Sequence, residues 1–234
     1  MQQDLIDKVA WIGKNLLFGP AKGIVLVFQG LGYAAMKMYA DPLEVAYGAA
    51  GAIVVAPDCG PWNWMNGVTQ DFVDELVDAL RQRYKLGEES PLVATGGSMG
   101  GMAALMYTMN SRHRVSGCLA NCPVCDVPFS YTERPDVPRT LHFALNSYGD
   151  IEQLMREHSP LHQVARLPDV PYMIVHGTED VDVSIARHSE PMVAAMKARK
   201  LNVDYRVAKG MEHCLPLPLE LQMEMAAFVA RLLR

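Results

Sequence analysis

The chain has 234 residues, of which half are hydrophobic and a fifth are charged, and its formal net charge is -5. This length suits one α/β domain with a sizeable core, and the mild acidity argues against the clustered positive charge of a nucleic-acid-binding surface. The N-terminus lacks a basic start followed by an apolar run, and no later stretch is long enough to span a bilayer. We therefore expect a cytoplasmic protein with neither a membrane nor a nucleic-acid partner.

The first half of the chain alternates strand and helix patterns. Residues 9–18 predict one or two edge strands before a Gly-Pro turn. Continuous apolar runs at 23–29 and 52–57 are typical of strands buried on both faces of a parallel sheet, and a helix is expected between them, within 34–50. A second helix begins with Thr69 as its N-cap and carries an apolar residue every four positions.

The second half continues this alternation. Strand patterns follow at 93–95, 115–120, 171–175 and 203–207. The helix expected at 99–109 is apolar on most faces and is therefore predicted to be buried, and further helices are expected over 184–200 and at the C-terminus. Strands that alternate with helices favour a mostly parallel sheet covered on both faces, so the predicted fold class is α/β.

The alternation breaks between about residues 121 and 169. This stretch has six prolines, two short helical patterns near 140–147 and 150–158, and no clear strand pattern. We expect a single domain over 1–234, with residues 122–168 forming a small cap insertion within it.

A glycine-rich turn carries the candidate nucleophile. Residues 96–100 match the pattern G-x-S-x-G between a strand and a helix, with Ser98 at the tip. A serine on such a sharp turn has a strained backbone and close neighbours, and Gly96 and Gly100 stand where side chains would collide. A phosphate-binding turn is the alternative, but the chain lacks both the Walker lysine and G-x-G-x-x-G spacing here.

Two more candidate groups lie just past predicted strands. Asp180 follows the strand at 171–175, with Glu179 and Asp182 as rival acids, and His213 follows the strand at 203–207. Catalytic groups in open α/β sheets gather at the carboxyl ends of strands, so these side chains are expected near Ser98.

The chain order serine, aspartate, histidine is the order of the α/β-hydrolase fold. The sequence resembles this superfamily, and more closely its dienelactone-hydrolase-like and prolyl-oligopeptidase-like esterases. The residues that carry the likeness are Gly96–Gly101, the pattern H-G-x-x-D-x-x-V from His176 to Val183, and Gly-x-x-His from Gly210 to His213.

These residue types predict a mechanism. His213 would accept the proton of Ser98 as general base, and Asp180 would fix the tautomer of His213 and stabilise its charged form. By resemblance, the backbone amides of Leu31 and Met99 would form the oxyanion hole; many relatives have His-Gly where this chain has Gln-Gly before Leu31. No metal ion or organic cofactor is expected.

Aromatic residues in the loops after strands predict an apolar pocket over Ser98. The candidates for substrate binding are Tyr33, Trp62, Trp64, Phe129, Tyr131 and, from the cap, His142. The predicted reaction is hydrolysis of a small apolar or aryl acyl ester through an acyl-enzyme. A thioesterase, a small serine peptidase, and a non-catalytic binding module on the same fold are the alternatives.

The remaining histidines and the cysteines have ordinary explanations. His176 is expected to support the loop of Asp180, and His113, His158, His162 and His188 are expected to be solvated.

Five cysteines are an odd number, which favours reduced thiols over a disulfide framework. Cys122 and Cys125 form a C-x-x-C pattern, but prolines follow closely where a redox pair needs a helix, so we expect neither a redox nor a metal role.

Overall fold

The computed structural model describes residues 1–145 and 149–234. In these residues seven strands form one sheet in the order β1-β3-β2-β4-β5-β6-β7. The strands are β1 (Ala10–Ile12), β2 (Gly23–Phe28), β3 (Ala52–Pro57), β4 (Leu92–Gly97), β5 (Gly117–Asn121), β6 (Tyr172–Gly177) and β7 (Val203–Ala208). Only β1 is antiparallel to its neighbour, so the prediction of a mostly parallel α/β sheet is confirmed.

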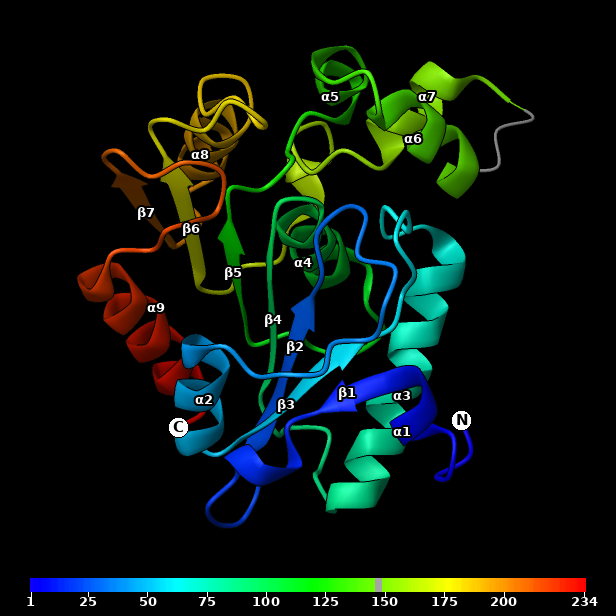
Figure 1. Ribbon diagram of the computed structural model, residues 1–234, viewed down its shortest axis with the longest axis vertical. Coiled ribbons are helices and arrows are strands. Elements are labelled where there is room, and N and C mark those ends of the chain that lie inside the picture. Colours follow the sequence, from blue (N-terminus) through cyan, green and yellow to red (C-terminus); the bar gives the residue numbers. More distant parts are fainter. Residues whose placement is uncertain (146–148) are drawn as a thin grey trace.

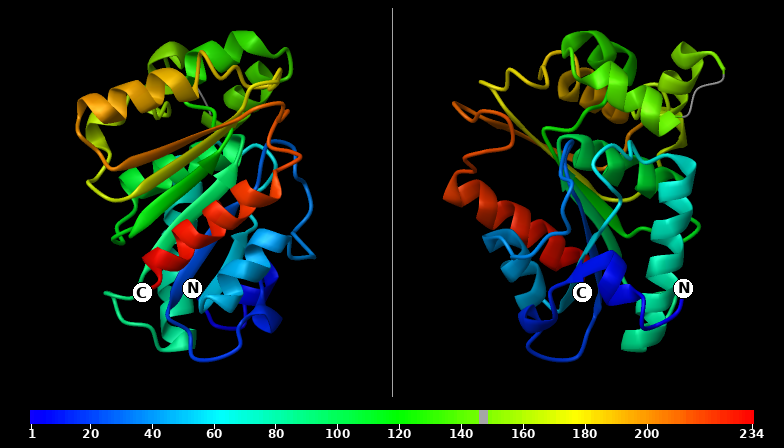
Figure 2. Two further views of the ribbon diagram at one scale, coloured as in Figure 1. Left: turned by 90° about the vertical axis from the view of Figure 1, so that its left-hand side faces the viewer. Right: turned by 45° about the vertical axis from the view of Figure 1, so that its right-hand side comes forward.

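Helices cover both faces of this sheet (Figures 1 and 2). The helices are α1 (Ile6–Val9), α2 (Pro42–Ala49), α3 (Gly67–Tyr84), α4 (Met99–Asn110), α5 (Val127–Glu133), α6 (Val137–Leu145), α7 (Ile151–Glu157), α8 (Ser189–Ala198) and α9 (Leu219–Leu232). One buried cluster joins α2 and α9 to the sheet, and another joins α3, α4 and α8 to the opposite face.

The alternation of side chains along each strand supplies both clusters. In β2, Ile24 and Leu26 pack on the face of α3 and α4, whereas Val25 packs on the face of α2 and α9. All three are buried, as the period of two along a strand requires when helices cover both faces of a sheet. This is why the strand reads as continuously apolar.

Helix α3 begins earlier than its sequence predicted, so the assignment of Thr69 as N-cap is wrong. The N-cap is Asn66, whose side chain accepts a hydrogen bond of 2.9 Å from the Thr69 N–H. Asparagine caps a helix as well as threonine does, and its carbonyl oxygen reaches the amide three residues on. The helix therefore gains most of an extra turn.

The segment between β5 and β6 is more helical than its prolines suggested. Helix α5 was not predicted, and it forms because Pro128 stands in its first turn, where a missing N–H costs nothing, and because Asp126 caps it. Of the pattern near 140–147, α6 covers the part up to Leu145, and residues 146–147 lie outside the described residues. The pattern at 150–158 is confirmed as α7.

Helices α5, α6 and α7 lie together beyond the carboxyl ends of the strands (Figure 1). The division into one domain with a cap at 122–168 stays a prediction. Among the described residues, no helix is both long enough and apolar enough to cross a membrane.

Candidate active site

Ser98 lies on a strained turn between β4 and α4. Its backbone has φ 59° and ψ -126°, a conformation that residues other than glycine rarely adopt. A Cβ added at Gly100 would lie 2.1 Å from the Phe28 carbonyl oxygen, and one at Gly96 would lie 2.4 Å from the Gly100 oxygen. The turn therefore requires glycine at both positions, for the reason that the sequence pattern indicated.

Asp180 and His213 meet in the loops that follow β6 and β7. Nδ1 of His213 lies 2.8 Å from Oδ2 of Asp180, whose side chain is fully buried. Oδ1 of Asp180 accepts hydrogen bonds from the N–H groups of Asp182 and Val183. Burial by itself opposes ionisation, but the hydrogen bonds from His176 and His213 outweigh it and hold the pKa of Asp180 well below its ordinary value.

The rival acids face elsewhere. The carboxylate of Asp182 pairs with Arg134 at 3.2 Å, and Glu179 is exposed next to Thr178. Of the three acids, Asp180 is therefore the one that contacts His213.

The other ring nitrogen of His213 faces two cysteines. Nε2 lies 3.9 Å from Sγ of Cys214, and the Cys214 N–H donates a hydrogen bond of 3.3 Å to Sγ of Cys122. Burial lowers the pKa of His213, but the hydrogen bonds to Asp180 and Cys122 outweigh it and raise that pKa to about 9. The interaction with Cys214 lowers the pKa of Cys122 and outweighs burial, which raises it. Among the described residues, Ser98 Oγ makes no hydrogen bond to His213.

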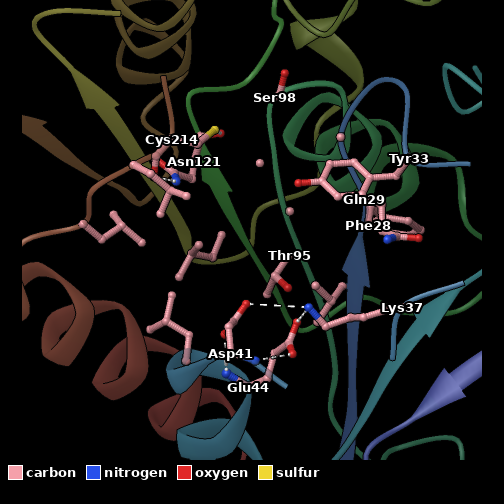
Figure 3. A pocket seen from close by; sticks show the side chains of 18 of the residues that line it. Phe28, Gln29, Tyr33, Lys37, Asp41, Glu44, Thr95, Ser98, Asn121 and Cys214 are labelled. Atoms are coloured by element: carbon pink, nitrogen blue, oxygen red, sulfur yellow. Dashed lines mark hydrogen bonds and ion pairs between the residues drawn. The ribbon is translucent and has the colours of Figure 1, made fainter. Parts of the chain in front are cut away.

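Ser98, His213 and Cys214 line one pocket of about 420 Å³. Figure 3 shows Ser98 at one end of this pocket and the charged side chains of Lys37, Asp41 and Glu44 at the other. The pocket is therefore large enough for a small organic substrate and carries charge opposite the serine.

Sequence reasoning missed this charged end. Nζ of Lys37 lies 2.9 Å from Glu44, which is almost fully buried, and 3.8 Å from Asp41. Burial raises the pKa of Glu44 against the opposing effect of Lys37. A signal was present, since Asp41-Pro42-x-Glu44 is a capping-box pattern. That pattern fixes the start of a helix, but it does not show that the helix starts at a pocket.

The two predicted oxyanion-hole amides belong to the ends of different elements. Met99 is the first residue of α4, where the first N–H groups of a helix have no intrahelical partner. Leu31 follows β2 and lines the pocket with Ser98. Within the described part of the chain, neither N–H donates a hydrogen bond to another residue.

The aromatic residues that were predicted to line one pocket lie in different parts of the structure. Tyr33 lines the pocket of Ser98, whereas Trp62 lines a second pocket of about 440 Å³ together with Leu31 and Arg134. Trp64 is 1% exposed and donates a hydrogen bond to Thr140. Trp64 thus lies in the core beside α6 and lines neither pocket.

The remaining candidates lie on the helices between β5 and β6. Phe129 packs its ring against Arg187 and His188. Tyr131 Oη lies 2.9 Å from Nε2 of His142. These three candidates do not line the pocket of Ser98, so their contact with substrate stays a prediction.

Two other histidines are structural. His176 is fully buried, with Nε2 2.9 Å from the Val183 carbonyl oxygen and 3.2 Å from Asp180, as expected of a residue that supports this loop. The expectation that His188 is solvated is wrong. It is fully buried because Nδ1 accepts two backbone N–H bonds and Nε2 lies 2.9 Å from Glu133.

Comparisons with known proteins agree with this architecture. The model of the prolyl oligopeptidase family matches residues 61–233. No curated protein sequence matches the chain.

Three solved structures illustrate the likeness of fold. Dipeptidyl peptidase 4 of Porphyromonas gingivalis has a TM-score of 0.73 at 20% identity, covering 94% of this chain and 33% of that one. Acylaminoacyl peptidase of Pyrococcus horikoshii has 0.74 at 14%, covering 94% and 38%. A truncated carbohydrate esterase from gut microbiota has 0.72 at 13%, covering 96% and 90%.

The chain thus spans well under half the length of these two peptidases and most of the length of the esterase. The family model covers most of the chain, and the sheet and its helices match those of the solved structures. The chain therefore belongs to the prolyl oligopeptidase family, a family of serine hydrolases with the α/β-hydrolase fold.

Proposed function

We propose that this protein is a serine esterase that hydrolyses carboxylic esters of small apolar or aryl acids through an acyl-enzyme. Ser98 is the nucleophile, His213 the general base, and Asp180 the acid that orients His213. The observation that carries this proposal is that Ser98, on its strained turn, and His213, held by buried Asp180, line the same pocket.

The chemistry follows from these groups. Ser98 Oγ attacks the ester carbonyl carbon while its proton passes to Nε2 of His213, and the Asp180 carboxylate stabilises the resulting imidazolium. The oxyanion receives hydrogen bonds from the N–H groups of Leu31 and Met99. His213 then returns the proton to the departing alcohol, and water hydrolyses the acyl-enzyme by the same steps.

This mechanism requires His213 to move toward Ser98. In the structure Nε2 faces Cys214 instead. Catalytic hydrogen bonds often lengthen in ligand-free enzymes and shorten when substrate binds. The loop of His213 follows β7 and ends before α9, so the ring can change its direction without altering the sheet.

The preference for esters over peptides rests on the pocket and on one relative. The pocket of Ser98 suits a small molecule, and the carbohydrate esterase is one of the similar structures whose length is close to that of this chain. The two peptidases support peptide hydrolysis as the second candidate. The third candidate, a non-catalytic binding module, would not need a His213 that contacts Asp180 in the same pocket as Ser98.

The test is hydrolysis of p-nitrophenyl esters of increasing acyl length and of benzoate type, beside a matched series of p-nitroanilides. We expect ester turnover, a loss of about 10⁴-fold or more in Ser98→Ala, and labelling of Ser98 by a fluorophosphonate. Ser90→Ala, at the opposite end of β4, is the matched control and should keep both properties. If the folded protein neither hydrolyses the esters nor reacts with the fluorophosphonate, the result would favour the binding module. If it cleaves the anilides faster than the esters, the result would identify a peptidase.

A further inference from the structure

Three ligand atoms of the kind that bind zinc lie together beside the candidate active site. Within residues 1–145 and 149–234, the sulfur atoms of Cys122 and Cys214 and a ring nitrogen of His213 all lie within 4.8 Å of one another. Cys122 follows β5, and the other two residues follow β7. The catalytic proposal gives these two thiols no role.

We propose that Cys122, Cys214 and Nε2 of His213 form a binding site for a zinc-class divalent metal ion, and that the bound ion inhibits the enzyme. The binding itself depends only on these three side chains. The inhibition rests on the proposed function, because the ion would occupy the nitrogen that must accept the proton of Ser98.

The spacing of the donor atoms suits a tetrahedral ion. Zinc binds thiolate sulfur at about 2.3 Å and imidazole nitrogen at about 2.0–2.1 Å, so neighbouring ligand atoms stand about 3.6–3.8 Å apart. Nε2 of His213 lies 3.9 Å from Sγ of Cys214, close to this separation. The remaining pairs lie within 4.8 Å, so side-chain shifts of about 1 Å close the site.

The imidazole of His213 is already oriented as a metal ligand. A carboxylate cannot donate a hydrogen bond, so in the neutral imidazole the 2.8 Å contact with ionised Asp180 places the ring proton on Nδ1 and makes Nε2 the atom that can bind a metal ion. Metal-binding histidines commonly donate their other N–H to a carboxylate in this way. The contact that prepares a general base therefore also prepares a ligand.

The charges of the three ligand side chains and the hydrogen bonds around them also suit a bound divalent ion. Two thiolates neutralise a divalent ion, so the site adds no net charge to a partly buried region. The Cys214 N–H donates to Sγ of Cys122, as backbone amides do to metal-bound sulfur. The ion binds two thiolates and an imidazole that has no proton on Nε2, so binding displaces the protons of these three groups while His213 keeps the proton on Nδ1.

The ion has a route to this site and a fourth ligand. His213 and Cys214 line the pocket of about 420 Å³, and Figure 3 shows Cys214 beside Asn121 at its wall. Water in the pocket can complete the tetrahedron. A site with three protein ligands and one water is typical of exchangeable zinc rather than of a closed structural site.

A neighbouring group of residues is less suitable. Cys122, His176 and Asp180 also place ligand atoms within 4.8 Å of one another. However, both ring nitrogens of His176 are engaged, one 2.6 Å from Ser189 Oγ and the other 2.9 Å from the Val183 carbonyl oxygen. A metal ion that bound either nitrogen would have to break the contact of that nitrogen in the core.

The binding test is a titration of fully reduced protein with Co²⁺, which reports tetrahedral geometry by its visible bands and thiolate ligation by its near-ultraviolet charge-transfer band. We expect one ion per chain with both signals. Removing even an outer partner of a metal ligand weakens affinity about 10–100-fold, so Cys214→Ala and Cys122→Ser should each weaken it at least about 100-fold.

Two control variants make this test specific. Cys59→Ala removes a partly buried thiol outside the cluster, and Ser98→Ala removes the proposed nucleophile. Both should bind Co²⁺ as the wild type does. Cys214 is only partly buried, so Cys214→Ala is the decisive variant, and its folding is checked by circular dichroism. Wild-type affinity in that variant, or a spectrum without thiolate bands, would overturn the site.

The second test is inhibition. If the protein hydrolyses p-nitrophenyl esters, Zn²⁺ should suppress turnover and a chelator should restore it, whereas Mg²⁺, which prefers oxygen ligands, should have no effect. Unchanged ester turnover by zinc-loaded protein would refute the inhibitory role. The Co²⁺ titration uses no substrate, so failure of the metal site and failure of the esterase proposal are separate results.

Discussion

At the scale of single residues, the turn around Ser98 is determined by backbone contact. Gly100 lets the first turn of α4 lie against the loop after β2, with the Phe28 oxygen where a Cβ would stand. A Cβ added at Gly101 would lie 3.1 Å from Cα of Pro123, which is a tight contact but a looser one than at Gly100. Because main-chain atoms cannot rotate away as a side chain can, these positions hold Ser98 in its strained conformation.

We therefore expect Gly100→Ala to destabilise the protein by about 1–3 kcal/mol or to prevent folding, because the new methyl group overlaps a carbonyl oxygen. The measurement is the free energy of unfolding in urea. Gly67→Ala is the control, since a Cβ at this first residue of α3 meets no atom within 4 Å. It should be neutral or stabilising, and an equal loss in both variants would contradict the contact argument.

At the scale of elements, one buried pair joins α5 to the segment that leads into α8. His188 contacts Glu133 at 2.9 Å, and the same carboxylate accepts a hydrogen bond from the Ser184 N–H. Burial opposes the charge of Glu133, but the hydrogen bonds from His188 and Ser184 outweigh it and lower its pKa. Arg134, the next residue, lines the pocket of Ser98, so this pair positions part of the pocket wall.

Glu133→Gln should lower the free energy of unfolding by about 1 kcal/mol at pH 7, because a charge-assisted hydrogen bond is lost. A carboxylate whose folded pKa is lowered stabilises the protein above its unfolded pKa, near 4.5, and this stability disappears as pH falls through the folded pKa. The difference between variant and wild type should therefore shrink below about pH 4.

Urea unfolding at several pH values measures this difference. Glu152→Gln is the matched control, because Glu152 forms an exposed pair with Arg156, and such pairs contribute about 0.5 kcal/mol or less. A deficit in Glu133→Gln that did not change with pH would show that ionisation of Glu133 has no part in stability.

At the scale of the whole molecule, a layer of helices covers each face of the sheet, and the layer of α2 and α9 shapes the pocket of Ser98. Helices α2 and α9 pack against each other and cover one face. The loop before α2 and the first turn of α2 supply the charged end of the pocket, and the loop before α9 carries His213. Packing of this layer therefore fixes two ends of the same pocket.

Phe228→Ala tests this layer, because Phe228 of α9 is 4% exposed within it. Its removal should cost about 3–5 kcal/mol, measured by urea unfolding. Met223 lies on the same helix but is 63% exposed, so Met223→Ala should change stability by less than about 0.5 kcal/mol. If both variants lost similar free energy of unfolding, burial of one face of α9 against the sheet would not be what stabilises this layer.

Much of this architecture could be read from local sequence. Strands β2 and β3 are continuous apolar runs, and the glycine pattern around Ser98 is a steric requirement of five consecutive residues. The order of Ser98, Asp180 and His213 after successive strands is equally visible, although their catalytic role stays a prediction. The start of α3 at Asn66 and the whole of α5 were not predicted, because side-chain caps decide the first turn of both helices.

Only the tertiary structure decided which distant side chains meet. Trp64 was predicted to line the pocket but packs in the core, whereas Lys37 and Glu44, which the sequence analysis did not single out, line the end of the pocket opposite Ser98. The sequence paired Cys122 with Cys125, yet its partner in space is Cys214. The physical reason is the strand order, which sets β5, β6 and β7 side by side and so joins loops that lie far apart along the chain.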